Sequence, residues 1–253
     1  NTGALDFAGG TVVHLTSGVT ALAAAIVIGK RKGHGTEHMA PHNLPMTLLG
    51  AALLWFGWFG FNGGSAVASG ALATSAFVVT HIATAAAALS WMIVEWIQRG
   101  KPTALGAASG AVAGLVAITP ASGFVGPMSS IVIGLGAGVV CYMAVSLIKP
   151  IFGYDDSLDA FGVHGVGGTF GAIATGLFAS KAINSAGNDG FFFGNASLLG
   201  TQIVAVVAVA VYAFVVSLIL LKIIDWTMGL RVSAEDEMMG VDLTHHGESG
   251  YTS

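Results

Sequence analysis

LDFAGGTVVH, at residues 5–14, combines an acid with a histidine inside an apolar segment. Asp6 stands at the mouth of the segment, and His14 follows eight residues later. In a helix with about 1.5 Å of rise per residue, His14 lies roughly 12 Å beyond Asp6. Because the hydrocarbon core of a bilayer is about 30 Å thick, we expect this ring near the midplane of a membrane. A polar ring at that depth is costly and indicates a pathway for a polar species.

A second histidine repeats this arrangement in FGVHGVGG, at residues 161–168. His164 follows Asp156 by eight residues, the spacing that separates Asp6 from His14, and it follows Asp159 by five. Two apolar helices that each begin with aspartate and each carry a buried histidine predict a paired site. A neutral imidazole has one donor and one acceptor, so two rings can bond each other and still offer a nitrogen to a ligand.

The histidine pair has three possible roles: a structural link between helices, a polar site on a transport path, or a metal site. The matched spacing favours the transport path. Zinc usually takes a third protein ligand, and no cysteine or carboxylate lies beside either ring in sequence, so we expect no metal. The sequence also lacks a nucleophile motif, a phosphate loop and a cofactor motif. We therefore expect neither an enzyme nor a cofactor.

The composition is typical of a polytopic membrane protein. Of the 253 residues, 54% are hydrophobic and 9% are charged, whereas about 25% of residues are charged in soluble domains. Many of the 37 glycines lie inside apolar runs, where small residues let helices approach closely in lipid. The net charge of −4, without a basic tract, gives no indication of nucleic acid binding.

Hydropathy predicts an all-α transmembrane bundle of seven spans. The expected spans cover residues 5–29, 45–68, 72–97, 104–119, 126–149, 158–180 and 196–224. The fourth and sixth are short and rich in glycine, which suits helices packed inside the bundle. We expect a membrane domain over residues 1–225 and a cytoplasmic tail over residues 226–253. The chain begins with Asn and enters an apolar helix almost at once, which predicts a fragment of a longer protein.

Lysine and arginine predict the orientation of the chain in the membrane. If the first span runs inward, eight of the nine basic residues fall on the inner side and Lys181 alone falls on the outer side. Basic residues are in excess in cytoplasmic loops, so the N-terminal end is expected outside and the tail inside. The two histidine-bearing helices are then antiparallel, as in the inverted repeats of transporters.

The second span ends in a dense aromatic segment, WFGWFGFNGGS, at residues 55–65. Aromatic residues near a helix end most often form an interfacial belt. Here they reach Ser65 at the outer face, where an aromatic face can attract a cation and a hydroxyl can accept a hydrogen bond from one. Asp6 also has a structural reading, because an acid at a helix start caps backbone N–H groups. We expect capping, with a negative potential as its consequence.

Together these motifs resemble the Amt/Mep/Rh ammonium transporter family, and within it the bacterial Amt branch. The matching stretches, in the order of the family, are DFAGGTVVH (6–14), PHNLP (41–45), GWFGFN (57–62) with Ser65, RGKP (99–102), FGVHG (161–165), GLR (229–231) and HGE (246–248). They extend over the whole chain and are specific as a set. The family has eleven spans and this chain resembles spans five to eleven, so the first four are expected to be missing.

The resemblance implies ammonium or ammonia transport through a hydrophobic pore, after recruitment of ammonium at the outer face and its deprotonation. It implies that His14 and His164 are the paired pore histidines and that Phe61 is a gating ring. The recruitment site would comprise Asp6, Ala8 and Ser65. The resemblance also implies a homotrimer in the lipid bilayer, with one pore per subunit. The tail resembles the segment that docks a PII-type nitrogen-signalling protein in bacterial relatives.

Two other functions stay open at this point. An ammonium sensor would bind the ion and signal with little conduction. A gas channel would carry carbon dioxide, as suggested for the Rh branch, although the DFAGG segment at residues 6–10 favours the Amt branch.

Overall fold

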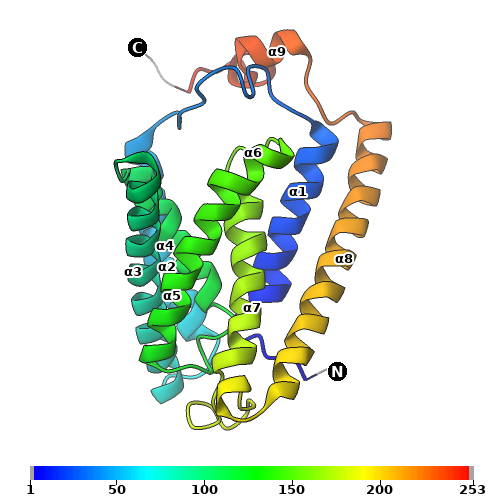
Figure 1. Ribbon diagram of the computed structural model, residues 1–253. Coiled ribbons are helices and arrows are strands. Elements are labelled where there is room, and N and C mark those ends of the chain that lie inside the picture. The colour runs from blue at the N-terminus through cyan, green and yellow to red at the C-terminus, as the bar shows by residue number, and fades with distance from the viewer. Residues whose placement is uncertain (1–2, 251–253) are drawn as a thin grey trace.

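Helices account for all the regular structure in residues 3–250, the part of the chain that the computed structural model describes. Figure 1 shows the long helices side by side in one bundle, with α9 and the loop after α1 together at one end. In chain order the elements are η1 Gly10–Leu15, α1 Thr16–Ile28, α2 Leu44–Gly64, α3 Ala71–Arg99, α4 Ala104–Ile118, α5 Pro127–Met143, η2 Ala144–Ile148, α6 Lys149–Phe152, η3 Phe161–Gly165, α7 Val166–Phe178, η4 Phe191–Phe193, α8 Ala196–Thr227, α9 Ala234–Met239 and η5 Asp242–His246.

Within residues 3–250, six helical segments are long and apolar enough to cross a membrane, which agrees with the predicted polytopic bundle. They are Gly10–Ile28, Leu44–Gly64, Ala71–Arg99, Pro127–Phe152, Phe161–Phe178 and Ala196–Thr227. The remaining expected span, 104–119, is helix α4, whose 15 residues extend about 22 Å against a hydrocarbon core of about 30 Å. The chain continues from α4 through a buried turn at 119–125. This segment therefore lies inside the bundle.

Glycines bring α3, α4 and α5 into close contact. A Cβ added to Gly114 of α4 would lie 2.7 Å from the carbonyl oxygen of Ala83, and one added to Gly110 would lie 2.6 Å from Cβ of Trp91. Gly134 of α5 faces the backbone of Ala83 in the same way. Small residues at such crossings allow close packing in lipid. The three helices form the scaffold behind the site.

A buried glutamine fixes the segment that precedes η1. The side-chain nitrogen of Gln202 in α8 donates to the carbonyl oxygens of Leu5 (2.8 Å) and Ala172 (2.9 Å), and its Oε1 accepts from the Leu5 amide at 2.7 Å. Gln202 is 1% exposed, so each of these bonds replaces one that water would otherwise supply. The glutamine thus attaches the beginning of the described chain to α7 and α8.

The loop after α1 is held by charged groups from two other parts of the chain. Arg31 donates from Nε and Nη2 to Asp155 at 2.9 and 2.7 Å, and this bond lowers the pKa of the Asp155 carboxyl to about 2. The Glu237 carboxylate of α9 accepts from the Lys32 amide at 2.8 Å and pairs with Arg231 at 2.6 Å. The loop therefore connects the tail to the segment before η3.

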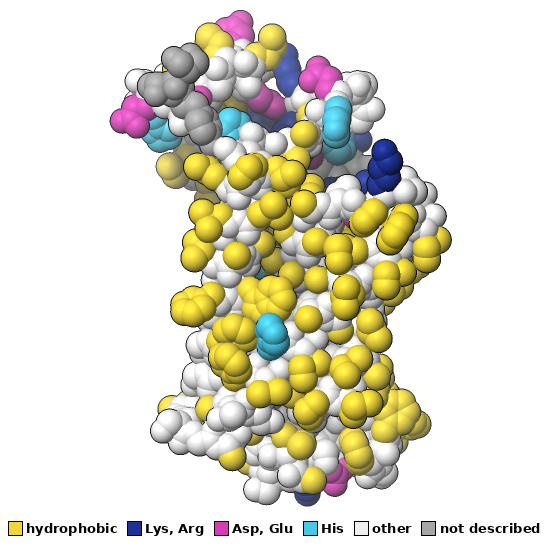
Figure 2. Space-filling view, turned by 90° about the vertical axis from the view of Figure 1, so that its left-hand side faces the viewer, with side chains coloured by type: hydrophobic (Ala, Val, Ile, Leu, Met, Phe, Trp, Pro, Cys, Tyr) yellow, Lys and Arg dark blue, Asp and Glu magenta, His cyan; other side chains and the backbone are white. Residues whose placement is uncertain are grey.

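The surface separates into an apolar belt and polar ends. Figure 2 shows hydrophobic side chains over the middle of one face, with most of its charged side chains gathered at the end that carries α9. Such a distribution is typical of a membrane protein whose middle portion contacts the lipid hydrocarbon. The predicted boundary between a membrane domain and a tail near residue 225 stays a prediction.

Candidate functional site

An aspartate caps the first histidine-bearing helix. The carboxylate of Asp6 accepts from the amides of Gly9 (3.1 Å), Gly10 (2.5 Å), Thr11 (3.0 Å) and Val12 (3.3 Å). It also accepts from the Thr11 hydroxyl at 2.5 Å. The first N–H groups of a helix have no carbonyl partner within it, and a negative charge suits this end of the helix dipole. Asp6 therefore directs its oxygens into the helix start.

Asp156 performs the same function for the second histidine-bearing helix. Its carboxylate accepts from the amides of Ala160 (3.1 Å) and Phe161 (2.7 Å). Asp159 instead forms an ion pair with Lys149 and adopts φ 56°, a left-handed conformation that is uncommon for residues other than glycine. Burial raises the pKa of the Asp159 carboxyl, while Lys149 opposes that shift. Of the two acids expected at this helix start, Asp156 is the cap.

Both histidines lie in short π-helical turns. His14 belongs to η1, which continues into α1, and His164 belongs to η3, which continues into α7. A π-helical turn inserts an extra residue into the helix and frequently occurs at functional sites. The repeated sequence spacing thus corresponds to a repeated local structure.

Glycines allow the two histidine-bearing helices to cross in backbone contact. A Cβ on Gly18 would overlap the backbone of Gly165, and one on Gly168 would lie 2.7 Å from the Gly10 carbonyl oxygen. Because of this crossing, Nδ1 of His14 lies 3.2 Å from Nδ1 of His164. One ring nitrogen must donate and the other accept, so the two tautomers are coupled.

Aromatic rings enclose the His14 side of the pair. His14 is 3% exposed and stacks on Trp58, with ring centroids 5.1 Å apart and an interplanar angle of 18°. The ring of Phe61 lies 5.8 Å from His14 and 5.4 Å from Trp58. Nε2 of His14 is buried and has no hydrogen-bond partner among residues 3–250. This nitrogen is available to a small ligand that can donate or accept a hydrogen bond.

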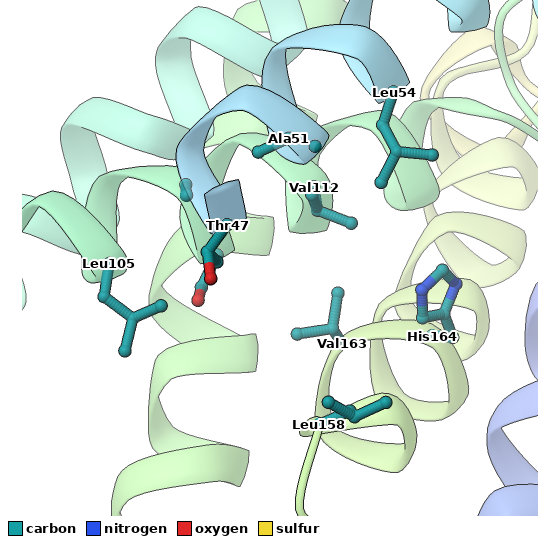
Figure 3. A pocket seen from close by; sticks show the side chains of 11 residues that line it. Thr47, Ala51, Leu54, Leu105, Val112, Leu158, Val163 and His164 are labelled. Carbon is teal, nitrogen blue, oxygen red and sulfur yellow. The ribbon is translucent and has the colours of Figure 1, made fainter. Parts of the chain in front are cut away.

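A mainly apolar cavity of about 310 Å³ leads to His164. In Figure 3 its wall comes from three segments: Thr47, Ala51 and Leu54 of α2, Leu105 and Val112 of α4, and Leu158, Val163 and His164 around η3. A second, larger and more polar cavity lies under the loop after α1 and shares Thr47, Leu105 and Leu158 with the first. Arg31 and Asp155 are among the residues that line this second cavity. A small molecule leaving His164 on this side would pass from an apolar into a charged environment.

The remaining residues expected at the site lie on two segments. Ser65 follows the end of α2 and donates its hydroxyl to the Phe61 carbonyl oxygen at 2.8 Å. Ala8 lies between Asp6 and η1, and within residues 3–250 no hydrogen bond joins Ser65 to Asp6 or Ala8. The structure therefore brings His14, His164 and Phe61 into one group, while the expected recruitment residues flank it.

Two residues of the aromatic segment at 55–65, Trp58 and Asn62, were not among the site residues expected from the sequence. Trp58 precedes Phe61 by three residues, a spacing that places both on one helix face and could have identified it. Asn62 is fully buried; its Nδ2 donates to Thr80 at 2.9 Å, and its Oδ1 has no partner in the described range. Residues 3–250 contain no cluster of three or more His, Cys, Asp or Glu side chains suited to a metal ion.

Comparison with known proteins extends over nearly the whole chain. Residues 1–251 match the model of the Ammonium Transporter Family. The chain is 57% identical to an ammonium transporter from Bacillus subtilis, covering 98% of this chain and 61% of that protein. It is 53% identical to ammonium transporter Amt1 from Archaeoglobus fulgidus, covering 99% and 63%. The chain thus spans about three fifths of the length of these relatives.

Solved structures of Mep2 and Amt proteins are also similar to this chain. Saccharomyces cerevisiae Mep2 superposes with a TM-score of 0.86 at 38% identity, covering 92% of this chain and 55% of that chain. A structure described as "Sensor Amt Protein" has a TM-score of 0.88 at 34% identity, covering 96% and 60%.

Proposed function

Because this chain belongs to the Ammonium Transporter Family, we propose that its parent protein moves ammonium or ammonia across a membrane through a pore at the histidine pair. The observation that carries the proposal is the 3.2 Å contact between His14 and His164, inside helices long enough to span a bilayer. The names of the relatives, ammonium transporters, describe transport rather than catalysis.

The chemistry of the pair suits neutral ammonia. An ion without water faces a large desolvation cost in an apolar pore, of order tens of kcal/mol for an isolated charge. Neutral ammonia avoids this cost but still needs a hydrogen-bond partner, which the free Nε2 of His14 provides. Ammonium therefore loses its proton before the pair, and the proton moves separately or through the coupled rings.

Recruitment takes place on the side of the pair that carries Phe61 and Ser65. Phe61 is 40% exposed and contacts His14 with its ring, so it can cover the histidine and move aside as a gate. Ser65 offers a hydroxyl oxygen, and the Ala8 backbone belongs to the same site. Asp6 supports it through its cap of η1.

Membrane orientation, assembly and the tail belong to the same proposal. The basic residues gather near the end that carries α9 (Figure 2), which favours placing the tail from residue 226 in the cytoplasm and the described N-terminal segment outside. We propose a homotrimer with one pore per subunit, and a tail that docks a PII-type signalling protein.

Uptake of labelled methylammonium by the full-length protein in lipid vesicles tests the transport function. His14→Ala removes the free nitrogen and the contact with His164. A loss of about 1.4 kcal/mol, within the range for a hydrogen bond, slows transport about tenfold. His81→Ala is the matched control, because His81 also lies in a membrane-spanning helix but its ring contacts are Trp55 and Phe59. Uptake that is equal in the parent and in His14→Ala would contradict the proposal.

A sensor is the second candidate, and the similarity to "Sensor Amt Protein" favours considering it. A sensor would bind ammonium with the same pocket but conduct little. The discriminating measurement is ammonium binding to the purified full-length protein, compared with uptake by the same preparation in vesicles. Binding that depends on His14 without measurable uptake supports the sensor, whereas binding with uptake supports the transporter.

A further inference from the structure

Beside the histidine pair lies a buried hydrogen bond to which the proposed function assigns no role. The indole Nε1 of Trp58 donates to the hydroxyl oxygen of Thr119 at 2.8 Å. Trp58 belongs to α2, and Thr119 begins the buried turn after α4. Trp58 is 7% exposed and Thr119 is fully buried. The bond therefore holds two parts of the bundle together immediately behind His14.

The direction of this bond is fixed. An indole nitrogen can only donate, and a threonine hydroxyl has a single proton. Thr119 gives that proton to the carbonyl oxygen of Leu115 at 2.7 Å, so its oxygen is left to accept from Trp58. The bonds form a chain from the indole through Thr119 to the backbone of α4, and such chains strengthen each member.

Trp58 is the neighbour that matches the plane of the His14 ring. Its indole lies at 18° to the imidazole, whereas the rings of Phe61 and His164 lie at 41° and 39°. A rotation of the indole would remove this flat support and tilt the imidazole. The contact with His164 is already 3.2 Å long, near the upper limit of about 3.2 Å for a good hydrogen bond, so a small tilt would break it.

We propose that Thr119 is a positioning residue for the histidine pair. By holding the indole of Trp58, it fixes the plane of the His14 imidazole and with it the direction of the free Nε2. The hydroxyl also keeps the indole N–H occupied, so that Trp58 presents its ring face to His14. This inference rests on the proposed transport function, because it assigns Thr119 a role in the same site.

Thr119→Val in the full-length protein tests the proposal, since valine keeps the shape but loses the acceptor. Misplacing a functional group by about 1 Å can lower a rate by up to about a hundredfold. The tilt expected here is smaller, so we predict that the maximal uptake rate of methylammonium falls about tenfold, with little change in KM. Thr119→Ser keeps the hydroxyl and should restore the rate. Thr84→Val is the matched control, because Thr84 is also fully buried and donates to a backbone carbonyl, that of Thr80, at 2.6 Å.

Trp58→Phe provides a second route to the same result. Phenylalanine keeps a ring for stacking but lacks the N–H, so Trp58→Phe should resemble Thr119→Val. The double variant, Trp58→Phe with Thr119→Val, should be no slower than the slower single variant, because each change removes the same hydrogen bond. Losses that multiply in the double variant, or a Thr119→Ser variant as slow as Thr119→Val, would overturn the proposal.

A solved structure of full-length Thr119→Val separates this inference from the transport function. We expect the angle between the Trp58 and His14 rings to depart from 18° and the two histidine nitrogens to move apart. Unchanged rings would overturn the positioning role, whether or not the protein transports. Absence of uptake by the parent protein, combined with displaced rings in the variant, would refute transport while supporting the positioning of His14 by Thr119.

Discussion

A single methyl group at Gly168 should separate the two histidines. A Cβ at this position would lie 2.7 Å from the Gly10 carbonyl oxygen, 2.9 Å from the Leu15 amide nitrogen and 3.1 Å from Cβ of His14. Carbon atoms pack at about 3.5–4.0 Å, so the two helices must move apart by roughly 0.5–1 Å. The Nδ1 atoms of His14 and His164, now 3.2 Å apart, would then be separated by roughly 3.7–4.2 Å, beyond hydrogen-bond range.

The assay for Gly168→Ala is methylammonium uptake by the full-length protein in vesicles. Losing a hydrogen bond worth about 1 kcal/mol slows transport about fivefold. Gly200→Ala in α8 is the matched control, because a Cβ there meets no atom within 4 Å, and it should transport like the parent. Two results would refute the reasoning: a solved variant whose rings still meet at 3.2 Å, or normal uptake when the rings are apart.

Three further changes test the supports of the site. Asp6→Ala removes the acceptor of four backbone amides and should lower the free energy of unfolding by about 2 kcal/mol, measured by denaturation in detergent; no loss would contradict the cap. Gln202→Leu leaves the Leu5 amide and carbonyl without their glutamine partner and should lower the free energy of unfolding by about 1–3 kcal/mol. Hydrogen exchange at the Leu5 amide should become faster in this variant. The bond from Arg31 lowers the Asp155 pKa from 3.8 to about 2. The stabilisation from this ion pair is therefore complete above pH 3.8 and is lost as the pH falls towards 2. In Asp155→Asn this part of the pH dependence should be absent when the free energy of unfolding is measured between pH 4 and 2.

The paired site was largely readable from the sequence because its signals are local. An acid eight residues before each histidine corresponds in the structure to a capped π-helical turn, and Asp6 and Asp156 both serve as the caps. The apolar runs gave the spans for the same reason, since hydropathy is a property of contiguous residues. The distribution of lysine and arginine predicted that the two histidine-bearing helices are antiparallel. Their contact depends on the close glycine crossing at Gly18 and Gly168, which the basic residues do not predict.

Other features depend on distant residues and left no local signal. Thr119 meets Trp58 across 61 positions of sequence, so no pattern of neighbouring residues predicts this hydrogen bond. Gly168 looks like many other glycines in the chain until the crossing of η1 and α7 shows what faces it. The sequence places both Asp156 and Asp159 shortly before His164 and does not show which of them caps the helix. In the structure Asp156 accepts from the amides of Ala160 and Phe161, whereas Asp159 pairs with Lys149.

Whether the two histidines work as one unit can be measured with three variants in the same vesicles: His14→Ala, His164→Ala and the double variant. If transport depends on the contact between the rings, either single change destroys it, and the double variant transports methylammonium no more slowly than the slower single variant. If the losses of the single variants multiply in the double variant, the two rings act independently, and the paired site proposed here is wrong.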